Sequence, residues 1–162
     1  MKLTTGIILF FLLSVITPVR AHGDGDPDHA HRHHKNEIGL AAYPVYFVKE
    51  KHSAFGLHMH YTRNISDSGF GLGLGAEQIF GEHKHSNIGI VASYNPWEML
   101  HLSISPGISI HNDEHTELDM SMHFEVSYGF AVKGLHIGPL LEFAIDREDY
   151  HLSLGLHFGL GF

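Results

Sequence analysis

The chain has 162 residues, and its 18 acidic and ten basic residues give a formal net charge of −8 at pH 7 with histidine neutral. This length suits one domain, and the acidic balance argues against nucleic acid as a partner, because nucleic-acid binding needs a basic patch. The sequence contains no cysteine, which excludes a disulfide framework, a lipoprotein anchor and a thiolate metal site, and its 17 histidines are the compositional outlier.

The first residues have the pattern of a secretory signal peptide. A lysine at the second position precedes the apolar run IILFFLLSVI at residues 7–16, and TPVRA follows shortly after. The run is too short to span a bilayer, and Val19 and Ala21 are small enough for a signal-peptidase site, so we predict cleavage after Ala21. An uncleaved anchor is the alternative. Cleavage of residues 1–21 removes two basic residues and no acid, which changes the net charge from −8 to −10.

Residues 22–35, HGDGDPDHAHRHHK, form a predicted disordered tail. They show no apolar periodicity and consist mainly of glycine, proline, aspartate and histidine. A flexible segment of this kind can wrap several imidazoles around one divalent ion, at modest affinity because binding costs ordering entropy. The predicted tail ligands are His22, His29, His31, His33 and His34.

From residue 36 onward, apolar and polar residues alternate, and turn-type clusters separate the alternating runs. The pattern predicts an all-β domain over residues 36–162, with about eight strands of about ten residues in an antiparallel up-and-down sheet. Pro106 and Pro139 lack the ladder donor, so we predict a bulge at each. The predicted strands are residues 37–49, 54–65, 69–80, 87–95, 99–111, 117–132, 134–146 and 150–162.

The last predicted strand indicates which face of the sheet meets lipid. In HLSLGLHFGLGF, residues 151–162, leucine and phenylalanine alternate with histidine, serine and glycine. A solvated face would be rich in lysine, glutamate, threonine and glutamine, whereas glycine and serine suit a cramped interior. Tyrosines and the single tryptophan fall near strand ends, where aromatic girdles of membrane barrels occur. We therefore predict a transmembrane barrel with its apolar face outward.

A signal peptide, about eight amphipathic strands, short turns and the final strand YHLSLGLHFGLGF together resemble small bacterial outer-membrane β-barrels of the OmpA/OmpX type. The resemblance covers residues 36–162 and concerns architecture, so it is informative about fold and poor in information about function. It implies a Gram-negative outer-membrane location, surrounding lipid, a periplasmic N-terminal tail, and recognition of Phe162 by the barrel-assembly machinery. A soluble periplasmic β-sandwich or lipocalin-like barrel is the alternative.

The inward polar residues have two interpretations. An eight-stranded barrel is just wide enough for its own side chains, so we expect no diffusion pore of the porin kind. Either the inward residues form a hydrogen-bonded and ionic plug, or His58 and His60, which point the same way, bind zinc, copper or nickel with ligands from neighbouring strands. The predicted inward residues are His58, His60, Glu77, His101, His111, His123, Glu125, His136, Glu142, His151 and His157.

Two further histidine motifs fall in predicted loops. EHKH at residues 82–85 and HNDEH at residues 111–115 combine imidazoles with carboxylates, as the tail does, although each is a weaker signal alone. His-rich segments bind metal whether or not this is their role. The predicted ligands here are His83, His85, His111 and His115.

Catalysis is the less favoured class. Some eight-stranded outer-membrane barrels, the lipid A deacylases and acyltransferases, use histidine and serine, and HLS occurs here at residues 101–103 and 151–153. Alternation puts each His–Ser pair on one face, but no oxyanion donor or orienting carboxylate can be assigned. We therefore predict a non-enzymatic barrel that needs no cofactor and binds or handles divalent transition-metal ions. A structural or adhesion barrel whose histidines only fill the lumen is the alternative, ahead of a lipid A-modifying hydrolase or acyltransferase.

Overall fold

A computed structural model of the chain describes residues 35–65, 68–81, 85–97, 99–112, 116–132, 135–147 and 149–162. The predicted signal peptide and almost all of the predicted tail lie outside these ranges. The part of the chain that the structure describes contains no helix long and apolar enough to cross a membrane. Its strands are β1 (Asn36–Phe47), β2 (His52–Asn64), β3 (Phe70–Phe80), β4 (His85–Trp97), β5 (Leu100–Asn112), β6 (Thr116–Tyr128), β7 (Phe130–Val132), β8 (Leu135–Ile145) and β9 (Tyr150–Gly161).

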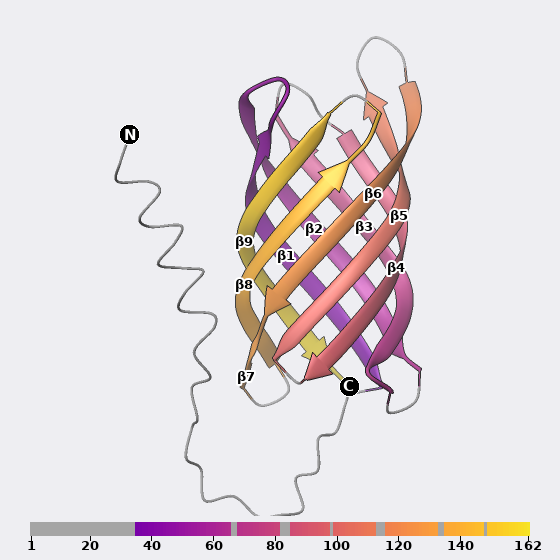
Figure 1. The fold of residues 1–162 in the computed structure, drawn as a ribbon, viewed down its shortest axis with the longest axis vertical. Helices are drawn as coiled ribbons and strands as arrows, with labels where there is room; N and C mark the ends of the chain where they lie inside the picture. Colours follow the sequence, from indigo (N-terminus) through magenta and orange to yellow (C-terminus); the bar gives the residue numbers. More distant parts are fainter. Residues whose placement is uncertain are drawn as a thin grey trace, which may run out of the picture. The chain divides into compact units, whose positions relative to one another are not determined.

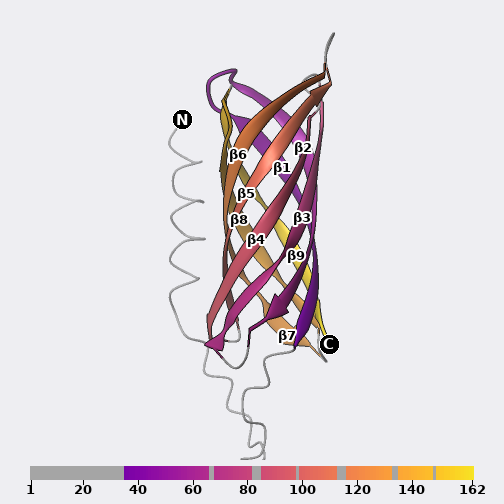
Figure 2. The same cartoon turned by 90° about the vertical axis from the view of Figure 1, so that its right-hand side faces the viewer.

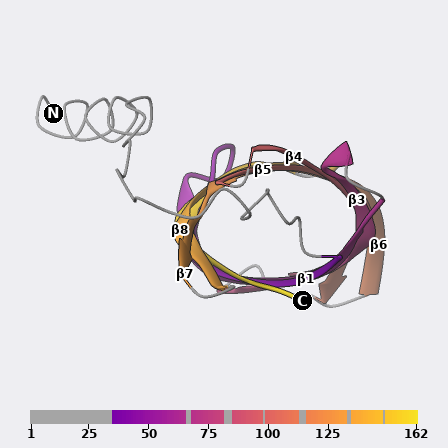
Figure 3. The same ribbon diagram turned by 90° about the horizontal axis from the view of Figure 1, so that it is seen from below.

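The strands form one closed antiparallel barrel (Figure 1). Strands β1 to β6 pair in sequence order, β8 pairs with β6, β7 and β9, and β9 pairs with β1, which closes the ring seen along the barrel axis in Figure 3. Strand β7 continues β6 in the same register, because Ser127 lies opposite Leu140 and Phe130 lies opposite Ile137. The two segments therefore form one continuous strand of the barrel wall. Counted in this way, the barrel wall consists of eight strands, as predicted from the sequence, and we call each of them a stave.

Both described ends of the barrel chain lie at the same end of the barrel, which we call the Phe162 end. The amide of Asn36 donates to the Phe162 carbonyl at 2.9 Å, and the amide of Phe162 donates to the Asn36 carbonyl at 2.9 Å. Figure 2 shows this end at the bottom, below staves that are tilted against the barrel axis. The turns after β1 and β8 lie at the opposite end.

The predicted bulges at Pro106 and Pro139 are wrong. Pro106 lies opposite Met122, and Pro139 lies opposite Leu156, in ladders whose register does not shift. In an antiparallel pair, a residue exchanges hydrogen bonds with one neighbouring strand only. A proline therefore loses pairing on one side, while the ladder on its other side keeps the register. The register shift that the structure records lies in β4 between Tyr94 and Trp97.

The apolar face of the barrel points outward, as predicted. Leu40 is 52 % exposed, Leu74 is 64 % exposed and Leu154 is 58 % exposed, although each is a large apolar side chain in the interior of its strand. The alternate positions are buried or half-buried, so each stave presents hydrocarbon outside and its other face to the lumen. This pattern is the inverse of a soluble barrel and is typical of a barrel surrounded by lipid.

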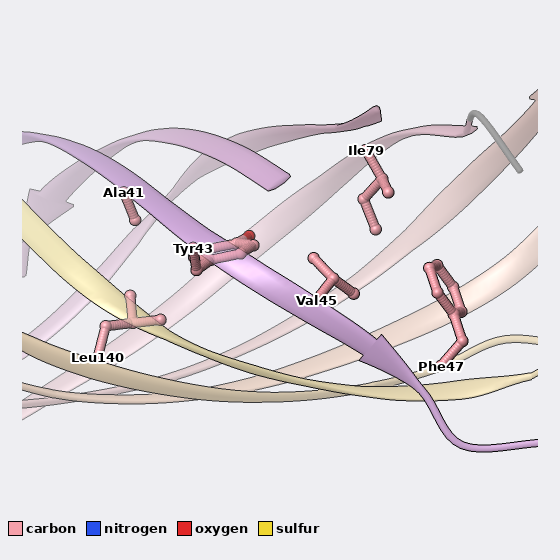
Figure 4. Close-up of a cluster of buried hydrophobic side chains, with 6 residues drawn as sticks. All are labelled: Ala41, Tyr43, Val45, Phe47, Ile79 and Leu140. Carbon is pink, nitrogen blue, oxygen red and sulfur yellow. The ribbon is translucent and has the colours of Figure 1, made fainter. Parts of the chain in front are cut away.

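One wall of the lumen is apolar, which the sequence analysis did not predict. Ala41, Tyr43, Val45 and Phe47 alternate along the inner face of β1 and pack with Ile79 and Leu140 (Figure 4). In the stretch EIGLAAYPVYF both faces carry apolar residues, so alternation could not distinguish them. This wall restricts the charged residues to the remaining part of the lumen.

Candidate metal centre

The predicted inward residues all lie on the lumen side of their strands. Their side chains are buried or half-buried, and they come from β2, β3, β5, β6, β8 and β9. Many polar groups therefore share a narrow interior, where each must find a partner or carry an energetic cost. Eight of them, together with Glu37 of β1, form three groups in which one ligand atom from each residue lies within 4.8 Å of the others.

The first group, which we call the central quartet, consists of Glu77, His123, Glu142 and His151. Four strands contribute one residue each, and all four side chains are buried. The register explains why the three residues of β6, β8 and β9 meet, while Glu77 of β3 joins them from a strand that pairs with none of these three. Ala144 of β8 lies opposite His123 on one side and opposite His151 on the other, and its small side chain leaves room for both imidazoles. Glu142 lies two residues before Ala144 and faces the same way.

The distances within the central quartet are longer than strong hydrogen bonds. His123 Nδ1 lies 3.4 Å from Glu142 Oε2 and 3.7 Å from Glu77 Oε2. His151 Nε2 lies 3.7 Å from Glu142 Oε1 and 4.0 Å from Glu77 Oε1. Direct N–H···O bonds are usually about 2.7–3.2 Å long, whereas metal–ligand bonds of about 2.1 Å in a tetrahedral shell place ligand atoms about 3.4 Å apart.

Two hydroxyl groups hold the carboxylates of the central quartet. The Tyr43 hydroxyl donates a hydrogen bond to Glu77 Oε1 at 2.7 Å and lies 3.4 Å from Glu142 Oε2. The Ser153 hydroxyl donates to Glu142 Oε1 at 3.2 Å. Glu77 Oε2 and His151 Nε2 are buried and make no hydrogen bond. The arrangement therefore has oriented carboxylates and at least two ligand atoms that are available to an ion.

The charges of the central quartet balance in two ways. Two carboxylates carry two negative charges, which two imidazolium groups can neutralise as an ionic plug. One divalent ion between two neutral imidazoles gives the same net charge, since metal ligation requires the deprotonated form. Two nitrogen and two oxygen donors suit divalent first-row transition metals. The quartet therefore fits both the plug and the metal interpretation of the sequence.

The other two groups share His60. One contains Glu37, His60 and His157, and the other contains His58, His60 and Glu125. Glu37 Oε1 lies 3.8 Å from His60 Nε2, and His58 Nδ1 forms a 3.2 Å hydrogen bond with Glu125 Oε2. His58 and His60 thus point the same way, as predicted. The neighbouring strand β1 brings the Glu37 carboxylate to His60, whereas the Glu125 carboxylate reaches His58 from β6, which does not pair with β2.

One histidine from each loop motif lies within the described residues, and the two meet at the opposite end of the barrel. His85 lies opposite His111 in the register of β4 and β5, with ring centroids 5.1 Å apart. His85, which we predicted to lie in a loop, is the first residue of β4 and is buried, because strand pairing extends further than the sequence pattern indicates. His111 Nε2 lies 4.0 Å from Asp146 Oδ2. Outside the described residues lie the other predicted ligands, His22, His29, His31, His33, His34, His83 and His115.

The chain is similar to known proteins in structure but matches none of the compared families or curated proteins in sequence. No protein-family model matches the chain, and no curated protein matches its sequence. Neisserial surface protein A (NspA) is 11 % identical with a TM-score of 0.55, over 78 % of this chain and 96 % of that chain. Ail, the attachment invasion locus protein of Yersinia pestis, is 12 % identical with a TM-score of 0.53, over 81 % of this chain and 100 % of that chain.

A designed transmembrane β-barrel is similar to the same degree, at 11 % identity and a TM-score of 0.56, over 80 % of this chain and 98 % of that chain. The chain has the fold of a small bacterial outer-membrane β-barrel. At this level of identity the likeness concerns the fold alone. The three metal-ligating groups in the lumen therefore rest on the structure of this chain and not on the comparison. The predicted architecture is confirmed.

The two HLS motifs do not form Ser–His pairs in this barrel. Ser153 donates its hydroxyl hydrogen to Glu142. His101 Nδ1 forms a 2.8 Å hydrogen bond with Asn95 Oδ1. Neither of these contacts joins the serine of an HLS motif to the histidine of the same motif.

The sequence analysis did not single out the residues that form the central quartet. It placed Glu77, His123, Glu142 and His151 in the lumen but proposed His58 and His60 as ligands, because these are neighbours on one strand. Which residues of four different strands come together depends on the stagger between the strands. The alternation of apolar and polar residues does not determine this stagger. The HLS motif at residues 151–153 drew attention to His151 for a different reason.

Proposed function

We propose that the chain is a non-enzymatic outer-membrane β-barrel that binds a divalent transition-metal ion inside its lumen. The location is supported by the outward apolar face of every stave and by the likeness to small outer-membrane barrels. The proposed orientation puts the Phe162 end and residues 22–35 in the periplasm. Phe162 then serves as the aromatic residue that the barrel-assembly machinery recognises.

One observation carries the metal proposal, namely the central quartet. Four buried residues from four strands bring one ligand atom each to within 4.8 Å of one another, and their nitrogen–oxygen distances of 3.4–4.0 Å are longer than typical direct hydrogen bonds. The hydroxyl groups of Tyr43 and Ser153 donate hydrogen bonds to the carboxylates of the quartet and so orient them. Metal ligands in proteins are commonly oriented by hydrogen bonds of this kind. Zinc is the first ion to test, because it accepts mixed imidazole and carboxylate ligands in a tetrahedral arrangement.

The second candidate function is a structural or adhesion barrel. The observation that favours it is the charge balance of the same quartet, which two protonated imidazoles would satisfy without any ion. In that case His123 and His151 are ion-pair partners of Glu77 and Glu142, and they fill the lumen. The two functions differ in one measurable property, which is whether the folded barrel takes up metal with a defined stoichiometry.

The test uses the mature chain refolded in detergent, with folding monitored by the heat-dependent gel shift of intact barrels. To remove the contribution of the tail, residues His22, His29, His31, His33 and His34 are changed to alanine, which gives the variant that we call the tail variant. Zinc titration by calorimetry of the tail variant should show saturable binding. Glu142→Gln in the tail variant should weaken this binding at least about tenfold.

Glu117→Gln is the matched control, because Glu117 is exposed at the beginning of β6 and belongs to none of the three groups. It should bind zinc like the tail variant. If the folded tail variant takes up no zinc, or if Glu142→Gln and Glu117→Gln bind it equally, the metal function of the quartet is wrong and the structural function replaces it.

A further inference from the structure

A second cluster of ligand atoms lies near the Phe162 end, over two glycines. Gly39 of β1 lies opposite His60 of β2 on one side and opposite Gly159 of β9 on the other. A Cβ atom at Gly39 would collide with the His60 imidazole and would lie 2.6 Å from His157 Nε2. A Cβ atom at Gly159 would lie 3.3 Å from Glu37 Oε1. The space in which these groups converge therefore exists because neither glycine has a side chain.

The nitrogen atoms that face this space have no hydrogen-bond partner. His60 Nε2 and His157 Nε2 are buried and unsatisfied, and both side chains are only 3 % exposed. The two rings are stacked, with centroids 5.3 Å apart and an interplanar angle of 10°. The nearest anion is Glu37, whose Oε1 lies 3.8 Å from His60 Nε2. Buried polar atoms without partners are rare in native proteins, and a bound ion is one explanation for them.

A third imidazole adjoins the cluster and is already oriented. The ring of His101 stacks on His60 at 5.7 Å and on His157 at 6.2 Å between centroids. The hydrogen bond between His101 Nδ1 and Asn95 Oδ1 makes Nδ1 the donor, so the lone pair lies on Nε2, which is buried and unsatisfied. A hydrogen bond on one ring nitrogen fixes the tautomer that leaves the other nitrogen free to ligate.

We propose that Glu37, His60 and His157, with His101 as a further imidazole, form a second metal site that prefers nitrogen-seeking ions, above all Cu²⁺. The site differs from the central quartet in its donors, which are mainly imidazoles, whereas the quartet has equal numbers of imidazoles and carboxylates. Imidazole ligands suit copper, and Cu²⁺ stands highest in the affinity order of the divalent first-row metals. The site goes beyond the zinc quartet and does not depend on it.

The residues next to this site limit how many ions this end of the lumen can hold. His60 also belongs to the group with His58 and Glu125, but His58 already forms a hydrogen bond with Glu125. An ion held by His60 and His157 therefore competes with this other group for the His60 imidazole. His136 Nδ1 lies 3.9 Å from Glu37 Oε2, whereas His60 Nε2 approaches the other oxygen of this carboxylate, Oε1. We expect one copper ion at this end of the lumen.

The test adds one equivalent of Cu²⁺ to the folded tail variant that also carries Glu142→Gln, so that the quartet is weakened. Electron paramagnetic resonance should show superhyperfine splitting from several imidazole nitrogens. His157→Gln in this background should reduce the number of coupled nitrogens and weaken copper binding at least about tenfold. Gly39→Ala should weaken it to a similar extent while keeping every ligand, because the added methyl group fills the space between the rings.

Gly81→Ala is the control for Gly39→Ala, because a Cβ atom at Gly81 would come no closer than 3.2 Å to Ala54 Cβ at the opposite end of the barrel. If Gly39→Ala does not fold, His60→Gln and His157→Gln provide the same comparison. Equal copper affinity in the folded Gly81→Ala, His60→Gln and His157→Gln proteins overturns the proposal. Loss of the nitrogen signal through Glu142→Gln alone also overturns it, since the copper then lies in the quartet.

Discussion

Tyr43 is the residue that connects the apolar wall of the lumen to the central quartet. Its ring is fully buried among the apolar side chains of β1, and its hydroxyl reaches the carboxylates of Glu77 and Glu142. A buried tyrosine needs a hydrogen-bond partner for its hydroxyl, and a buried carboxylate needs donors. The one contact satisfies both requirements and fixes which oxygen of Glu77 remains available.

Tyr43→Phe tests this role. The change keeps the ring but removes the donor to Glu77 Oε1, so the carboxylate is no longer held in position. We expect zinc affinity of the tail variant to fall about tenfold, as is usual for the loss of an outer-shell partner, while the barrel still folds. Tyr46→Phe is the matched control, because Tyr46 points outward from the same strand and is 45 % exposed. Equal zinc affinity in the two variants would contradict the assignment.

At the scale of the strands, the sequence predicted the faces of the barrel but not its contacts. A period of two in β5, β6, β8 and β9 is enough to place His101, His123 and His157 in the lumen. Which of these residues meet depends on the stagger between strands, and here Ala144 separates His123 from His151 without any signal in the sequence. The apolar inner face of β1 could not be predicted either, because both faces of this strand carry apolar residues.

A glycine in a strand can mark a position where two backbones approach closely. A Cβ atom at Gly138 of β8 would collide with the carbonyl group of Tyr128, at the point where the stave of β6 and β7 is interrupted. Backbone cannot move aside as a side-chain end can. We expect Gly138→Ala to lower the free energy of unfolding by about 1–3 kcal/mol, the usual cost of overpacking. Urea titration of the barrel in lipid vesicles measures the change.

Gly81→Ala serves as the reference for Gly138→Ala, because its added methyl group meets only the side chain of Ala54 at close range. It should unfold at nearly the same urea concentration as the unchanged barrel. If Gly138→Ala is as stable as Gly81→Ala, the interruption between β6 and β7 is more adaptable than the structure indicates.

For the whole molecule, the decisive question is whether lipid covers the outer face. Leu141 lies near the middle of β8, points outward and is 49 % exposed. Met120 of β6 also points outward and is 85 % exposed, but it lies beyond the last residue pair that joins β6 to β8, Met122 with Ile145. Both side chains are therefore apolar and exposed, yet only Leu141 is placed to lie within the hydrocarbon layer.

The same substitution at both positions measures this difference. Leu141→Arg should reduce the free energy of unfolding in lipid vesicles by about 2–4 kcal/mol, whereas Met120→Arg should cost about 0–1 kcal/mol, because the cost of a charge depends on its depth in the bilayer. Urea titrations of the two variants give both values. Small and equal costs would mean that water covers Leu141, and a soluble barrel would then replace the membrane barrel. A large cost at Leu141 alone would place the lumen groups inside a membrane-spanning wall, where ions reach them only from the two ends of the barrel.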